Sequence, residues 1–178
     1  MSRWVRTIPA VLLLLVAASP VLYYQAGNLV YTQAAANSPD CSGHSARNSP
    51  DEFSVTLWHE DVDVATHNKS DTLASNLEPL WFDHWENATI EVPGEPITLA
   101  AWIMEQNASS PWVIVVHGIR SCKANHEALI PAAWLHQAGY NVILFDMRDH
   151  GNSTIEDGLI SAGQREHRDV LAVWQWLQ

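Results

Sequence analysis

The fold is decided by residues 111–153, which read PWVIVVHGIRSCKANHEALIPAAWLHQAGYNVILFDMRDHGNS. Two short apolar runs in this stretch, residues 112–116 and 141–145, are typical of fully buried parallel strands. The segment between them has helical character and is closed by Gly139. About 30 residues separate equivalent points of the two runs, which suits a right-handed crossover. The stretch therefore predicts one strand–helix–strand unit.

Each predicted strand runs out into a polar turn, and a third motif opens the last helix. The first turn is His117-Gly118-Ile119. The other two motifs are the set Asp146, Arg148, Gly151 and Ser153, and the set Gly163, Glu166, Asp169 and Val170. In this order and spacing the three motifs resemble the α/β-hydrolase superfamily. The likeness is closest to membrane-linked serine hydrolases of the dienelactone-hydrolase and S33-peptidase type.

The resemblance covers residues 80–178 and implies an α/β fold. Residues 89–92 and 97–104 flank a Pro-Gly-Glu-Pro turn, a pattern that predicts a hairpin. In the family, the first two antiparallel strands lie here. We therefore expect an incomplete α/β-hydrolase sheet, with an antiparallel hairpin followed by the parallel strand–helix–strand unit, behind an N-terminal membrane helix.

The family carries its nucleophile on a Gly-x-Ser-x-Gly elbow, followed along the chain by an acid and a histidine. No Gly-x-Ser-x-Gly occurs here, and Gln178 falls inside the helix that precedes the nucleophile strand in the family. We expect the N-terminal part of a serine hydrolase that acts on an ester, thioester or peptide bond. Without a Ser-Asp-His triad, this chain alone is predicted to be inactive.

Two other functions remain open. A non-catalytic, membrane-anchored hydrolase-like binding protein is the main alternative. A nicotinamide-dependent reductase is the third, because Asp146 ends a second parallel strand and could bind a ribose hydroxyl. That site needs three glycines after the first strand, and only Gly118 is present there. We therefore expect no cofactor, and a small-molecule or peptide acyl group as substrate.

The turn after the first strand is the candidate oxyanion hole. Acyl transfer builds negative charge on a carbonyl oxygen, which fixed backbone N–H donors stabilise. By the resemblance, the N–H of Ile119 is the donor, with that of Arg120 as second choice. Gly118 allows the backbone to approach closely. His117 is expected to hold the turn by hydrogen bonds rather than to act as a general base.

The residues after the second strand are expected to support the site. Asp146, Arg148, Gly151 and Ser153 predict a hydrogen-bonded turn at its floor, with Arg148 paired to a carboxylate. Asp146 does not fit the triad acid, because in the family that acid follows the serine. Glu166 and Asp169 are interpreted as structural, with paired catalytic carboxylates as the sharper alternative.

Two helices are predicted around these turns. A helix beginning at Asn125 with a kink at Pro131, and one whose main part begins at Pro131, fit the sequence equally well. Residues 161–164 fit a capping box that opens the last helix. Cys122 and Lys123 lie in the loop before the first helix, and Cys122 is expected to be a plain loop thiol rather than a nucleophile.

The N-terminus predicts the location of the protein. Arg3 and Arg6 precede an apolar run over residues 8–24. This run fits an uncleaved membrane anchor, or a secretory signal cleaved after Ala36. The arginines favour export of the remainder. We expect residues 1–30 to be an anchor or signal, residues 31–79 a polar stalk, and residues 80–178 the hydrolase part. Secretion after cleavage is the alternative to a single-pass membrane protein.

Charge and cysteine content narrow the partners. The formal net charge of −11 would repel nucleic acid, so we expect none as a partner and contact with the membrane only through the N-terminal helix. An oxidising compartment would permit a disulfide between Cys41 and Cys122, but two cysteines are too few for a disulfide framework, and free or mispaired thiols are predicted. A polar, histidine-bearing stretch between residues 59 and 67 matches no metal-ligand spacing, so no metal is predicted.

Overall fold

The computed structural model describes residues 4–37, 41, 47–55 and 77–178, with side chains from residue 16 onward. The chain divides into two compact units, Met1–Ala36 and Asn37–Gln178. The segment between residues 59 and 67, for which no metal site was predicted, lies outside the described residues.

The first unit consists of one helix, α1, over Trp4–Ala35. It contains the apolar run over residues 8–24 and extends beyond that run at both ends. Among the described residues, however, no helix combines the length and the apolar character that crossing a membrane requires. The side chains of residues 8–15 lie outside the described part of the chain.

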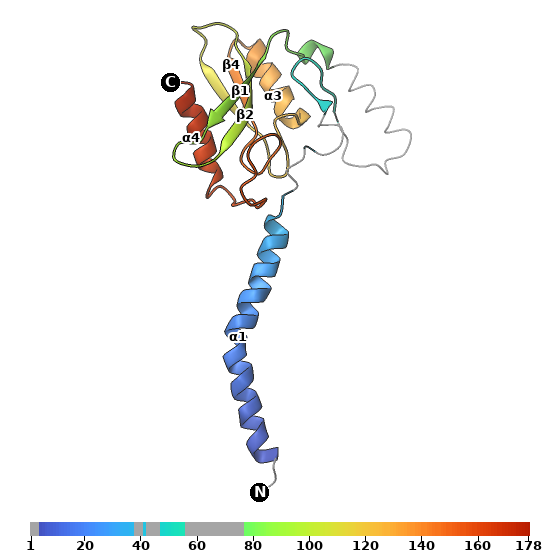
Figure 1. The fold of residues 1–178 in the computed structure, drawn as a ribbon. Coiled ribbons are helices and arrows are strands. Elements are labelled where there is room, and N and C mark those ends of the chain that lie inside the picture. Colours follow the sequence, from blue (N-terminus) through green and yellow to red (C-terminus); the bar gives the residue numbers. More distant parts are fainter. Residues whose placement is uncertain (1–3, 38–40, 42–46, 56–76) are drawn as a thin grey trace, which may run out of the picture. The chain divides into compact units, whose positions relative to one another are not determined.

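The second unit is built on a four-stranded mixed sheet (Figure 1). Its strands are β1 (Glu86–Glu91), β2 (Thr98–Met104), β3 (Trp112–Val116) and β4 (Asn141–Phe145), in the order β1-β2-β4-β3. β2 is antiparallel to both of its neighbours, whereas β3 and β4 run parallel. The predicted hairpin and the predicted parallel pair are both confirmed. All five residues of β4 are buried, as its central place in the sheet requires.

Two helices cover opposite faces of this sheet (Figure 1). α3 (His126–Gln137) packs Leu129 against one face, and α4 (Glu166–Trp176) packs Val173 against the other. α3 begins after Asn125, whose side chain accepts a hydrogen bond from the Glu127 N–H, and it continues through Pro131. Of the two predicted starts for this helix, the structure shows the earlier. A short 3-10 turn, η2 (Glu78–Leu80), precedes the sheet.

The predicted start of the last helix is wrong. Residues 162–165 form a turn, and α4 begins only at Glu166. The expected capping box does not form, because the Glu166 carboxylate binds residues that precede the helix. It accepts hydrogen bonds from the backbone N–H of Ser161 (2.7 Å) and of Gly163 (2.8 Å), and from the Ser161 hydroxyl.

Part of the predicted stalk belongs to the core. Phe53 is 2% exposed and packs in the cluster beneath α3. The Asn48 side chain is buried and donates to the carbonyl oxygens of Ala124 and Ser54. The sequence pattern of this segment is polar, yet the segment also accepts hydrogen bonds from Trp81 Nε1 at the Phe53 carbonyl and from the Phe82 N–H at the Pro50 carbonyl. Among residues 47–55, at least Asn48 and Phe53 are therefore buried.

β3 is an edge strand within the described part of the chain, where it pairs with β4 alone. Its five residues are apolar, yet none is fully buried, and Val116 is 43% exposed. An apolar strand with one unpaired edge is a surface that native proteins normally cover or pair. In composition, β3 therefore resembles an interior strand, although it has one strand neighbour among the described residues.

Candidate active site

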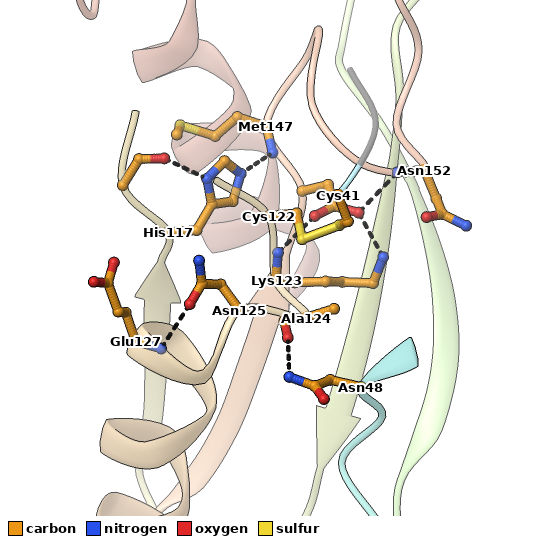
Figure 2. The surroundings of a disulfide bond; sticks show 12 residues. Cys41, Asn48, His117, Cys122, Lys123, Ala124, Asn125, Glu127, Met147 and Asn152 are labelled. Carbon is orange, nitrogen blue, oxygen red and sulfur yellow. Dashed lines mark hydrogen bonds and ion pairs between the residues drawn. A yellow bond between two sulfur atoms is a disulfide. The ribbon is translucent and has the colours of Figure 1, made fainter. Parts of the chain in front are cut away.

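His117 holds the turn after β3 through both of its ring nitrogens (Figure 2). The Met147 N–H donates to Nε2 at 3.1 Å, so Nδ1 carries the ring proton and donates to the Gly118 carbonyl at 2.8 Å. The ring thereby links the end of β3 to the second residue after the end of β4. Since neither nitrogen is available, the arrangement fits the predicted turn-holding role and leaves no site for a general base.

The environment of His117 keeps its imidazole neutral. Burial lowers its pKa from 6.5 to about 4, although the hydrogen bond to Gly118 works in the opposite direction. The ring of His150, whose centroid lies 4.8 Å away, adds to the lowering. A neutral ring is the form that the two backbone contacts require, because Nε2 must accept.

Acidification should therefore weaken the fold through His117. The unfolded chain takes up this proton near pH 6.5 and the folded chain only near pH 4, so the free energy of unfolding should fall as the pH drops through that window. The loss attributable to His117 should approach about 3 kcal/mol. Urea unfolding at a series of pH values measures it, with His117→Gln as the control that lacks this proton. Equal pH slopes for the two proteins would contradict the assignment.

The residue that carries the candidate oxyanion donor is exposed. Ile119 is 70% exposed, and its N–H has no hydrogen-bond partner among the residues that the structure describes. Arg120 follows with a φ of 57°, in the left-handed region that few residues other than glycine adopt. Strained backbone of this kind is frequent where a loop must aim a group. The role predicted for Ile119 and Arg120 remains a prediction.

Asp146 ties this loop to the end of β4. Its carboxylate accepts hydrogen bonds from the Lys123 N–H at 2.7 Å and the Asn152 N–H at 2.9 Å, and pairs with the Lys123 ammonium at 2.5 Å. Both carboxylate oxygens of Asp146 therefore have hydrogen-bond partners. Gly151 is required beside it, because a Cβ there would lie 2.2 Å from Asp146 Oδ2.

A disulfide between Cys41 and Cys122 flanks the same loop, and Figure 2 shows it beside Lys123. The prediction of free or mispaired thiols, and of a plain loop thiol at Cys122, is therefore wrong. The two residues are 81 positions apart, and no local pattern reports such a pairing. The fold brings their Cα atoms within 5.7 Å, which suits a disulfide. A Cys122 nucleophile is excluded while this bond is intact.

Arg148 is buried and paired with a carboxylate, as predicted. Its guanidinium donates from Nη2 to Asp169 Oδ1 at 2.7 Å and from Nη1 to Glu95 at 2.7 Å. The Arg148 N–H also donates to Asp169. Burial alone would lower the pKa of Arg148, but these carboxylates raise it above its ordinary value. Asp169 therefore joins α4 to the turn after β4, which is the structural role that the sequence suggested.

Ser153 completes the predicted turn. Its hydroxyl donates to the Asp146 carbonyl at 2.5 Å and accepts from the Ala100 N–H at 2.9 Å. The turn is thereby joined to β2 as well as to β4.

Hydrogen bonds from Ser161 and Gly163 hold the side chain of Glu166. Although burial alone would raise the pKa of this carboxyl, these bonds lower it to about 2. A permanently ionised carboxylate in these contacts does not fit a proton-transferring partner for Asp169.

Three buried residues of this region were not predicted. Lys123 is the partner of Asp146, Asp149 accepts three backbone N–H bonds from residues 156–158, and His150 packs against His117. Each depends on contacts between separate turns. The only sequence signal was the coincidence of a lysine in one strand-end turn with an unpaired acid in the next.

A solvent-open hollow of ≈ 190 Å³ lies elsewhere on the sheet. Its lining is rich in hydroxyl groups and consists of Thr89, Thr98, Leu99, Ala100, Asn152, Ser153 and Thr154. Neither Ile119 nor Arg120 lines it. The hollow therefore shares the supporting turn with the candidate site but does not contain the oxyanion donor.

No protein-family model matches the chain, and no curated protein matches it either. Among solved structures, the Pyrococcus furiosus esterase Pf2001 matches with a TM-score of 0.49 and 25% identity, over 70% of this chain and 40% of that one. The α/β-hydrolase GrgF from Penicillium sp. sh18 matches with a TM-score of 0.41 and 22% identity, over 53% and 32%.

A probable hydrolytic enzyme from Pseudomonas aeruginosa PAO1 matches with a TM-score of 0.40 and 18% identity, over 72% of this chain and 35% of that one. The chain thus spans less than half the length of these proteins. TM-scores below 0.5 describe a likeness of part of the fold and nothing about activity. The three structures are thus described as an esterase, an α/β-hydrolase and a probable hydrolytic enzyme.

Proposed function

We propose that this chain forms the front half of the sheet and one arm of the oxyanion hole of a serine hydrolase. One observation carries this proposal: the Ile119 N–H has no hydrogen-bond partner among the described residues. Ile119 lies in the turn after β3, which the two hydrogen bonds of His117 hold in place. A donor with no internal partner is free to stabilise the oxyanion of an acyl-transfer intermediate. The substrate would be an ester, thioester or peptide.

The open edge of β3 supports the same proposal. Within the described residues the strand pairs with β4 on one side only, so its other edge has no strand partner there, and its apolar side chains are incompletely buried. In the complete hydrolase, a further strand bearing a Gly-x-Ser-x-Gly elbow would pair there and aim its serine at the turn after β3. The second oxyanion donor would be the N–H of the residue after that serine. A non-catalytic binding protein is the alternative if no such elbow follows.

Replacing Ile119 by proline tests the role of this N–H. Proline removes the donor but keeps an apolar side chain in an exposed place. In the complete protein, Ile119→Pro should lower the rate of labelling by a fluorophosphonate about 100-fold or more, the usual effect of losing one oxyanion donor. Ile119→Ala keeps the N–H and serves as the matched control, with labelling close to the parent rate. Equal loss in both variants, or in neither, would sink the assignment.

Export of the protein is part of the proposal. It is supported by the Cys41–Cys122 disulfide, since such bonds persist in oxidising compartments, and by the apolar N-terminus behind Arg3 and Arg6. Cell fractionation with alkylation of free thiols before lysis tests it. The exported fraction should contain the chain with both cysteines protected from alkylation. Recovery of an alkylated chain from the cytoplasm alone would contradict export.

A further inference from the structure

The loop after β3 is restrained covalently on one side. Cys122 follows the candidate oxyanion turn by three positions, is 1% exposed, and is bonded to Cys41, which is partly exposed. The two sulfur atoms and a carboxylate oxygen of Asp146 all lie within 4.8 Å of one another. The disulfide therefore lies directly against a buried negative charge.

The same loop is restrained by charge on the other side. The backbone N–H of Lys123 donates a hydrogen bond to Asp146 Oδ1, and its ammonium donates one to Oδ2. The ammonium also lies 4.8 Å from the centroid of the Trp102 ring. Figure 2 shows Cys122 and Lys123 together, with the hydrogen bonds of His117 nearby. Two neighbouring residues thus connect the turn to Cys41 and to the end of β4.

We propose that the Cys41–Cys122 disulfide is a thiol-sensitive switch. Its redox state determines how rigidly the turn that carries Ile119 is held. Its catalytic meaning rests on the function proposed above, whereas its structural effect does not. A small dithiol is the reductant. One of its thiolates attacks the more accessible sulfur, that of Cys41, and Cys122 leaves and takes up a proton. The second thiol then displaces Cys41, so the reductant becomes a disulfide and the protein gains two thiols.

Reduction acts on the turn because the site around Cys122 is closed. Two sulfur atoms that were bonded must move apart to van der Waals contact, and Cys122 and Asp146 are both buried. Each new S–H is a donor next to the Asp146 carboxylate, so it competes with Lys123 for the same oxygens. Both changes loosen the link between the turn and β4. The ladder of β4 with β2 and β3 involves none of these groups and should persist.

Hydrogen exchange on the full 178-residue chain tests this inference, with and without dithiothreitol. Protection of the Lys123 N–H, which is bonded to Asp146 in the oxidised chain, should fall at least about tenfold on reduction. Protection of the β4 amides should stay within about twofold. Loss of protection at both Lys123 and β4 would show that the disulfide stabilises the whole fold. No loss at Lys123 would show that the disulfide is not coupled to the loop. Either result overturns the switch.

A double variant and a second readout complete the test. Cys41→Ser/Cys122→Ser should give the loosened Lys123 amide without reductant, and dithiothreitol should change it no further. Lys123 should react with an amine acylating reagent faster in the reduced chain than in the oxidised one. If the oxidised and reduced chains react equally, the proposal fails. In the complete protein, reduction should also lower fluorophosphonate labelling, and reoxidation should restore it.

The exchange result and the labelling result separate the two proposals. A loosened Lys123 amide in a protein that never reacts with a fluorophosphonate would contradict the hydrolase function and leave the switch standing. Labelling that is identical in both redox states, with an unchanged Lys123 amide, would contradict the switch and leave the hydrolase function standing.

Discussion

Gly151→Ala should lower the free energy of unfolding by about 3 kcal/mol or more, or prevent folding altogether. A Cβ at this position would lie 2.2 Å from Oδ2 and 2.3 Å from Cγ of Asp146. The carboxylate cannot retreat, because Lys123 and the Asn152 N–H hold it with bonds of 2.5 to 2.9 Å. The substitution therefore breaks a buried ion pair as well as a tight turn. Urea unfolding followed by tryptophan fluorescence measures the effect.

Gly158→Ala is the matched control. Gly158 has a φ of +72°, compared with +51° for Gly151, but a Cβ there meets no atom within 4 Å. This variant should lose only about 1 kcal/mol, the cost of a left-handed backbone without glycine. The difference between the two variants isolates the collision with Asp146. Equal losses would show that backbone strain alone explains Gly151.

Asp169→Ala should destabilise the fold by about 3–5 kcal/mol, because it leaves the buried Arg148 guanidinium without its main partner. Asp169 accepts from Nε, Nη2 and the backbone N–H of Arg148, and both side chains are fully buried. The other two carboxylates on Arg148, those of Glu95 and Glu156, engage only Nη1. Thermal or urea unfolding of the purified variant measures the loss.

Two further variants make this result specific. Asp157→Ala removes an exposed partner of Arg165 and should cost less than about 1 kcal/mol. Arg148→Met in the Asp169→Leu background removes both buried charges and should recover much of the loss, since an apolar pair needs no desolvation of ions. If Asp169→Ala costs no more than Asp157→Ala, the Arg148–Asp169 pair does not hold α4 to the turn.

The sheet could be predicted because its information is local. β3 is apolar throughout and β4 is apolar after Asn141, both are of strand length, and the Pro-Gly-Glu-Pro turn joins β1 to β2. Such patterns depend on burial and turn chemistry, which the residues themselves carry. The start of α4 was missed because the Glu166 carboxylate bonds backward to Ser161, a contact that overrides a local capping pattern.

The centre of the site could be predicted only as a set of motifs. The sequence indicated that Arg148 needs a carboxylate, but the choice of Asp169 follows from how α4 crosses the sheet. The disulfide and the Lys123–Asp146 pair join residues from separate loops, and no spacing rule reports them. Phe53 was hidden in a polar segment because one buried aromatic leaves no periodic pattern.

Fluorophosphonate labelling of the complete protein from its native source tests the central claim most directly. The polypeptide that yields the peptides of β3 and β4 should carry the label on one serine within a Gly-x-Ser-x-Gly sequence, and Ile119→Pro should slow that labelling about 100-fold or more. A polypeptide that contains these peptides but takes up no label, in either redox state, would contradict the serine-hydrolase account and favour a binding protein.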